Sequence, residues 1–118
     1  MAYNELLADK ITEILEEKNV SFTIKKMFGG LCYMVEDKMC CGLLQDKKTE
    51  EDLFMCRVGE EAYEESLSKE DCIPMEFTGK SMKGFVNIIG ESLMSKKKLS
   101  YWIQKSLDYN PKAKKRKK

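Results

Sequence analysis

The sequence predicts an α+β domain with a mainly antiparallel sheet of five to six strands and flanking helices, in the order α-ββββ-α-ββ-α. Apolar residues recur at helical spacing near both ends of the chain and once in its middle, and short β-rich runs lie between them. Strands and helices do not alternate singly, which argues against a doubly wound parallel sheet. The 118 residues suffice for one domain with its own core. We assign residues 1–110 to this domain and residues 111–118 to a basic, disordered tail.

The first helix and the first strands follow from the spacing of apolar residues. A helix ending near Asn19 is predicted by apolar residues at i, i+3, i+4 and i+7, namely Leu6, Leu7, Ile11, Ile14 and Leu15. The run "SFTIKKMF" alternates as a strand does and stops at two glycines. The run "LCYMVEDKMCCGLL" predicts a hairpin whose turn is Glu36-Asp37. Another strand is expected in "LFMCRV", after the polar loop "QDKKTEED".

The second half of the chain is predicted to hold two further helices and two further strands. "EEAYEESL" reads as a short helix with acids on its outer face. "MEFTG" and "FVNII" read as strands on either side of a turn in "GKSMKG", and Gly79, Lys80 and Ser81 are expected within that turn. A last helix is predicted by Leu99, Trp102, Ile103 and Leu107 and ends at Pro111.

The net charge of +1 hides an asymmetry between the body and the tail. The last seven residues hold six cations and no acid: Lys112, Lys114, Lys115, Arg116, Lys117 and Lys118. The other 111 residues carry 15 basic and 20 acidic side chains, a net charge of −5. Non-specific nucleic-acid binding needs a basic surface, so only the tail is a candidate for weak nucleic-acid contact.

Five cysteines and the lack of histidine limit the chemistry that the chain can carry. The hairpin register that follows from the turn pairs Val35 with Lys38, Cys32 with Cys41 and Tyr33 with Cys40. In that register Cys40 and Cys41 point to opposite faces, and the chain has no C-x-x-C pair, so a zinc site is not expected. We interpret the cysteines as apolar core residues, with a redox role for Cys32 and Cys41 as the alternative. Folding should then depend on neither metal nor disulfides.

Two further features of the sequence are candidates for binding. "TGKSMKG" has the Gly-Lys-Ser end of a phosphate loop, but Pro74 stands where the first glycine of that motif belongs. Lysines beside glycines, namely Lys25, Lys26, Lys80 and Lys83, form a candidate interaction patch if their two segments are neighbours. The alternative for these lysines is simple solvation.

Three ordered blocks resemble the TfoX N-terminal domain family, the bacterial TfoX/Sxy competence regulators. The blocks are "KKMFGGLCYMVEDKMCCG", "LFMCRVGEEAYEESL" and "PMEFTGKSMKGFVNI", and the resemblance spans about residues 3–108. It implies a secretion-chaperone-like α+β fold and a regulator or adaptor rather than a catalyst. The larger regulators act with a cyclic-AMP receptor transcription factor and carry a C-terminal helical domain, whereas this sequence ends in a basic tail. The family-like positions are Lys26, Met27, Phe28, Gly29, Gly30, Arg57, Gly59, Phe77, Gly79, Met82, Lys83 and Gly84.

The sequence leaves three functions open. The first is a non-enzymatic regulatory or adaptor module that binds a protein partner, with a transcription factor and a second copy of the chain as alternatives. The second is a nucleic-acid-binding accessory that uses the tail, and the third is a small thiol-dependent enzyme. No catalytic residue, metal ligand or cofactor site is assigned. The charged first residues and the lack of a long apolar run predict a cytoplasmic protein with no signal peptide and no membrane span.

Overall fold

The computed structural model describes residues 4–27, 30–45, 51–69, 71–77 and 80–112. The elements in chain order are α1 Glu5–Glu17, β1 Thr23–Met27, β2 Gly30–Val35, β3 Lys38–Gln45, β4 Asp52–Arg57, α2 Glu60–Leu67, β5 Cys72–Phe77, β6 Lys80–Ile88, the 3₁₀ helix η1 Gly90–Met94, α3 Lys96–Tyr109 and the 3₁₀ helix η2 Asn110–Lys112. Six strands form one sheet in the order β1-β2-β3-β4-β6-β5, and every neighbouring pair is antiparallel. The predicted class and element order are confirmed.

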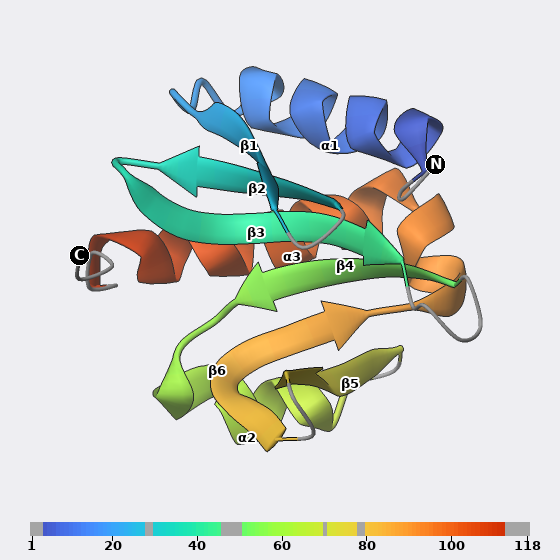
Figure 1. Cartoon of the computed structure of the whole chain (residues 1–118), viewed down its shortest axis with the longest axis vertical. Coiled ribbons are helices and arrows are strands. Elements are labelled where there is room, and N and C mark those ends of the chain that lie inside the picture. Colours follow the sequence, from blue (N-terminus) through green and yellow to red (C-terminus); the bar gives the residue numbers. More distant parts are fainter. Residues whose placement is uncertain (1–3, 28–29, 46–50, 70, 78–79, 113–118) are drawn as a thin grey trace.

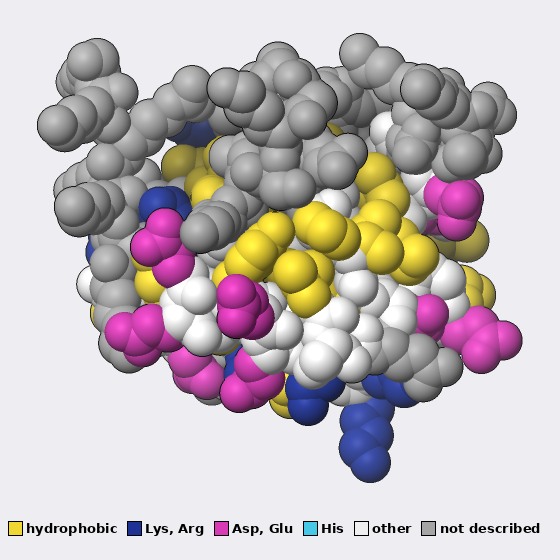
Figure 2. Space-filling view, turned by 90° about the horizontal axis from the view of Figure 1, so that it is seen from below, with side chains coloured by type: hydrophobic (Ala, Val, Ile, Leu, Met, Phe, Trp, Pro, Cys, Tyr) yellow, Lys and Arg dark blue, Asp and Glu magenta, His cyan; other side chains and the backbone are white. Residues whose placement is uncertain are grey.

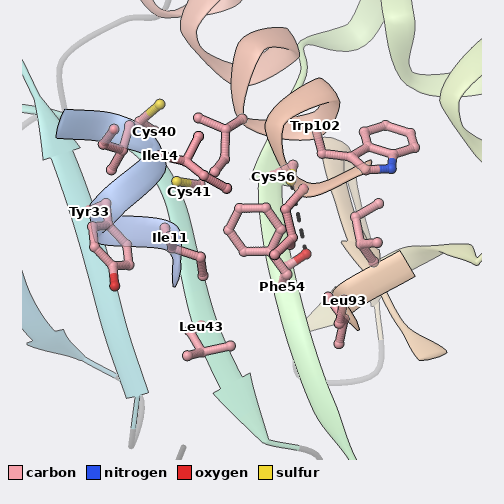
Figure 3. Close-up of a cluster of buried hydrophobic side chains, with 14 of the residues drawn as sticks. Ile11, Ile14, Tyr33, Cys40, Cys41, Leu43, Phe54, Cys56, Leu93 and Trp102 are labelled. Carbon is pink, nitrogen blue, oxygen red and sulfur yellow. Dashed lines mark hydrogen bonds between the residues drawn. The ribbon is translucent and has the colours of Figure 1, made fainter. Parts of the chain in front are cut away.

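The helices cover one face of the sheet (Figure 1). The core between them joins the apolar stripes of α1 and α3 to alternate residues of the strands, such as Tyr33, Leu43, Phe54 and Val86, each 0 % exposed. Figure 3 shows Ile11 and Ile14 of α1 and Trp102 of α3 facing these strand residues. A single apolar face on each helix and a period of two along each strand give this one-sided packing.

The opposite face of the sheet carries the intervening strand residues. Cys32 and Met55 are each 3 % exposed yet lie outside the main core cluster. The register places them in one row across the sheet with Gly42 between them. A Cβ on Gly42 would lie 3.2 Å from the Met55 methyl carbon, Cε, so Met55 packs over the glycine. This row forms a second, smaller apolar layer.

The ends of the long helices are capped by side chains, as their sequences allow. The Asn4 side-chain oxygen accepts a hydrogen bond from the Leu7 backbone N–H at 3.2 Å, and the Ser95 hydroxyl accepts one from the Lys98 N–H at 3.3 Å. The N-cap residue of α2 is Gly59, which offers no side-chain cap. In the described part of the chain, no helix has the length and apolarity needed to cross a membrane.

The structure corrects the predicted hairpin register. Val35 does pair with Lys38, and Met34 pairs with Met39, but Tyr33 then lies opposite Cys41 and Cys32 opposite Gly42. The predicted pairs Cys32 with Cys41 and Tyr33 with Cys40 are therefore wrong. The reason is a β-bulge on β3, where Cys40 is an extra residue without a partner of its own on β2.

The predicted turn in "GKSMKG" is also wrong where the structure describes it. Lys80, Ser81 and Lys83 belong to β6, which begins at Lys80, while Gly79 lies outside the described residues. Ser81 pairs with Glu76 and Lys80 with Phe77, so pairing with β5 extends the strand past the point where local turn signals suggested an end. The 3₁₀ helix η1 was not predicted.

The turn between β2 and β3 gives a test of local backbone strain. Glu36 and Asp37 both have positive φ, 53° and 63°, as a type I′ turn requires. Replacing Glu36-Asp37 by Asn-Gly should stabilise the protein by roughly 0.5–1 kcal/mol, because Asn and Gly adopt this conformation at lower cost. Urea unfolding measures the change. Gly-Asn at the same positions is the matched control and should stabilise less, and a loss of stability with Asn-Gly would contradict the turn assignment.

Candidate functional site

The cysteines are buried inside the domain and do not form a site open to ligands. All five are free thiols and all five are buried. The bulge turns both Cys40 and Cys41 into the core, where they are 1 % and 0 % exposed, and their side chains share a hydrogen bond. The expectation that these neighbours point to opposite faces is therefore wrong. Cys41 also lies directly opposite Cys56 on β4, and both point toward the helices (Figure 3).

Four of the five thiols have a raised pKa, which favours their protonated form. Burial raises the pKa of Cys32 and of Cys72 from the ordinary 9.0 to about 11. The hydrogen bond with Cys40, followed by burial, raises the pKa of Cys41, and burial raises the pKa of Cys56. A thiol nucleophile needs a lowered pKa and access to solvent. These four thiols have neither.

The described ranges of the chain contain no set of side chains that could hold a metal ion. Within them, no three His, Cys, Asp or Glu side chains are grouped so that they can hold an ion. A structural zinc site needs four such ligands. Metal-independent folding stays a prediction.

The four candidate lysines lie on two strands that are not neighbours. Lys25 and Lys26 are on β1, an edge of the sheet, and Lys80 and Lys83 are on β6. Three strands separate β1 from β6, so at about 4.8 Å per strand the two strands lie roughly 19 Å apart across the sheet. The sheet does not bring the four residues together as one compact patch, and binding by either pair remains a prediction.

Lys25 and Lys26 themselves lie on an exposed strand edge. Thr23, Ile24, Lys25 and Lys26 are all exposed, and Ile24 is 45 % exposed although it is apolar. Lys25 pairs with Cys32 on the face of the sheet away from the helices, and Lys26 pairs with the core residue Leu31 on the helix face. Neither lysine forms an ion pair with any described residue. Their charges therefore project from both faces of one edge.

An open groove of about 440 Å³ lies between the start of α2 and the end of α3. Its charged lining comprises Glu60, Glu61, Asp108 and Lys105, so acids predominate. Figure 2 looks at the end of the molecule that holds α2 and β5 and shows acidic side chains around a band of hydrophobic ones. Glu60 and Glu61 in the first turn of α2 satisfy the helix dipole, and they disfavour an anionic ligand there.

Comparison with known families identifies the domain. The family model described as the TfoX N-terminal domain matches residues 14–109, most of the chain. The chain belongs to the TfoX N-terminal domain family. Comparisons with curated proteins and with solved structures found no match.

Three of the family-like positions in this TfoX N-terminal domain build the junction between β4, α2 and β6. The Gly84 carbonyl accepts hydrogen bonds from the backbone N–H groups of Val58 and Gly59 at 2.8 and 3.0 Å. Gly59 and Gly84 have φ of 89° and 93°, where side chains are strained. The guanidinium carbon of Arg57 lies 5.3 Å from the centroid of the Phe85 ring and 5.8 Å from that of the Tyr109 ring. These contacts give Arg57, Gly59 and Gly84 a role in the fold.

The other family-like positions are less informative. Lys26 and Gly30 lie on β1 and β2, and Met27, Phe77, Met82 and Lys83 lie on β1, β5 and β6. Phe28, Gly29 and Gly79 lie outside the described residues.

The exposed β1 edge was missed by sequence reasoning. Its only sequence signal was the adjacent pair Lys25-Lys26 in a strand pattern, which is a recognised feature of edge strands.

The raised thiol pKa values predict a loss of stability at alkaline pH. The unfolded chain releases these protons near pH 9, whereas Cys32 and Cys72 keep them until about pH 11 in the folded state. The stabilising contribution is therefore complete below pH ~9 and is lost as pH rises toward ~11, by up to about 1.4 kcal/mol per pH unit for each thiol. Urea unfolding with reductant across this range measures the slope. Cys32→Ala should reduce the slope of the unfolding free energy against pH by the contribution of one thiol. Equal slopes in both proteins would refute the raised pKa of Cys32.

The β4–α2 junction predicts a large cost for a single methyl group. A Cβ on Gly59 would overlap the Tyr109 ring, and the φ of 89° at Gly59 is itself unfavourable for a residue with a side chain. Gly59→Ala should therefore destabilise the domain by about 3 kcal/mol. Chemical denaturation of Gly59→Ala, Tyr109→Ala and the double variant separates the two causes. Tyr109→Ala should recover the steric part of the loss but not the backbone part, and strictly additive losses would contradict the contact.

Proposed function

We propose that this chain is a non-enzymatic regulatory or adaptor module that acts by binding a protein partner. The observation that carries the proposal is the exposed edge of β1, where four consecutive residues are solvent-exposed and no described strand pairs with the outer side. Membership of the TfoX N-terminal domain family supports a regulatory role at the level of the family. Transcriptional co-regulation in the bacterial cytoplasm, as in the Sxy proteins, is the specific form that we propose.

The chemistry of the interior favours binding over catalysis. Burial keeps the pKa of Cys32, Cys41, Cys56 and Cys72 above the ordinary value, so a thiolate nucleophile is disfavoured at neutral pH. The sequence contains no histidine to act as a general base. The thiol-dependent enzyme is accordingly the weakest of the three functions that the sequence left open.

Affinity capture from the native host followed by reconstitution tests the proposal. The full chain is immobilised, retained proteins are identified after nuclease treatment, and each is purified and titrated against the chain. We expect a stable complex with a regulatory protein, and a transcription factor supports the specific form. A chain that retains no protein in reconstituted form, or that turns over a substrate, contradicts the proposal.

A second candidate, weak nucleic-acid binding by the basic tail, is favoured by the charge asymmetry. Residues 113–118 carry five of the six tail cations, and the body is net acidic. Deleting residues 113–118 should leave the unfolding midpoint almost unchanged and remove any weak, salt-sensitive binding to DNA or RNA, because phosphate contacts release counterions. Electrophoretic shift assays at low and physiological salt compare the two forms. Unchanged binding by the truncated chain would assign the contact to the folded body.

A further inference from the structure

The chemistry of the β1 edge suggests what kind of partner it fits, which goes one step beyond the proposed function and rests on it. The sheet has two edge strands, β1 and β5, which differ in how regularly they pair with their neighbours. β5 contains Pro74, which lacks an N–H donor, and its register with β6 shifts between Pro74 and Glu76. β1 pairs with β2 in one unbroken register from Thr23 to Met27. Of the two edges, β1 is the regular template for another strand.

We propose that β1 binds an extended, acidic segment of a partner protein, which adds to the sheet as an antiparallel seventh strand. Backbone hydrogen bonds to the free edge supply affinity in this mode, and alternate side chains supply specificity. Lys25 projects from the face away from the helices and Lys26 from the helix face, so each face of the added strand meets one cation. Carboxylates at two successive positions of the segment satisfy both.

The exposed isoleucine adds a third element to the recognition pattern. Ile24 is 45 % exposed and precedes the two lysines on the strand. In an antiparallel pair, the residues opposite Lys26, Lys25 and Ile24 follow one another from the N- to the C-terminus of the added strand. The predicted motif is therefore acidic, acidic, apolar. The apolar residue would cover Ile24 through a cross-strand contact.

The same lysines argue against a second copy of this chain as the occupant. A symmetric antiparallel pairing centred on Lys25, the middle residue of β1, places Lys25 opposite Lys25 of the second copy. Centring it on Lys26 places Lys26 opposite Lys26 in the same way. Like charges directly opposite each other are destabilising. Centring the pair on Ile24 avoids this repulsion but leaves only Thr23, Ile24 and Lys25 of β1 paired, which makes a short interface. The charges thus disfavour the two longer self-pairings, and they attract an acidic partner.

Peptide binding to the full-length chain tests the proposal directly. The probe is a capped peptide of about nine residues, rich in Thr and Val, with Glu-Glu-Ile at its centre. We expect binding that weakens with salt, together with slowed hydrogen exchange of the β1 amides. A peptide with Lys-Lys-Ile at its centre should bind at least about tenfold more weakly, because two favourable charge contacts become two repulsive ones. Equal binding of both peptides overturns the proposal, as does binding without protection of β1.

Charge reversal on the protein supplies the reciprocal test. The Lys25→Glu/Lys26→Glu double variant should exchange its preference and bind the Lys-Lys-Ile peptide. Lys97→Glu/Lys98→Glu is the matched control, since these are also adjacent exposed lysines without an ion pair among the described residues, and it should keep the original preference. Loss of binding to both peptides in a variant that remains folded by circular dichroism, or an equal effect of both double variants, overturns the proposal.

Backbone methylation separates strand addition from simple charge attraction. N-methyl groups on alternate residues of the Glu-Glu-Ile peptide block the hydrogen bonds along one of its edges only. One methylation pattern should abolish binding and the complementary pattern should preserve it, and equal effects of both patterns overturn the proposal. A captured partner that binds Lys25→Glu/Lys26→Glu as well as it binds the unchanged chain would overturn this inference alone. Failure to capture any partner would count against the proposed function itself.

Discussion

One-sided burial of the sheet is the constraint on which the rest of the structure depends. Tyr33 shows how it is met: its ring is fully buried, it lies 6.0 Å from the Phe22 ring centroid, and its hydroxyl donates a hydrogen bond to the Ala8 carbonyl of α1. This contact holds α1 against β2, one strand inside the sheet edge. α3 takes the centre through Trp102 and Ile103. Since all three α-helices serve one face, the outer edge of β1 stays exposed.

Much of this arrangement could be predicted, because it depends on local signals. The helical spacing of Leu7, Ile11 and Ile14 predicts α1. The turn at Glu36-Asp37 follows from a polar pair between two β-rich runs. Both signals act over a few residues. The element order and the sheet type follow from them.

The hairpin register could not be predicted, because "MCCGLL" lacks the alternation of apolar and polar residues that shows which side chains face the core. Apolar residues fill successive positions, so either face can be turned to the core and the extra residue at Cys40 leaves no mark in the pattern. The same limit applies to the lysine patch. Lys25 and Lys80 each stand near glycines, but only the sheet order, which inserts β6 between β4 and β5, shows that three strands separate them. Strand order is a long-range property that spacing along the chain does not report.

The interior of the domain and its β1 edge have different roles. The buried thiols, the Gly59–Gly84 junction and the stacked Arg57 hold the fold, and their chemistry is closed to solvent or used up in packing. What the described chain presents to other molecules at β1 is backbone and charge. A free edge is a hazard for any sheet, since identical edges pair and aggregate, and lysines are a common protection against it. That protection is selective rather than absolute, because it repels a second copy and attracts a carboxylate. On β1, therefore, the lysines that oppose the pairing of two identical edges are the same residues that would attract the acidic segment that we propose.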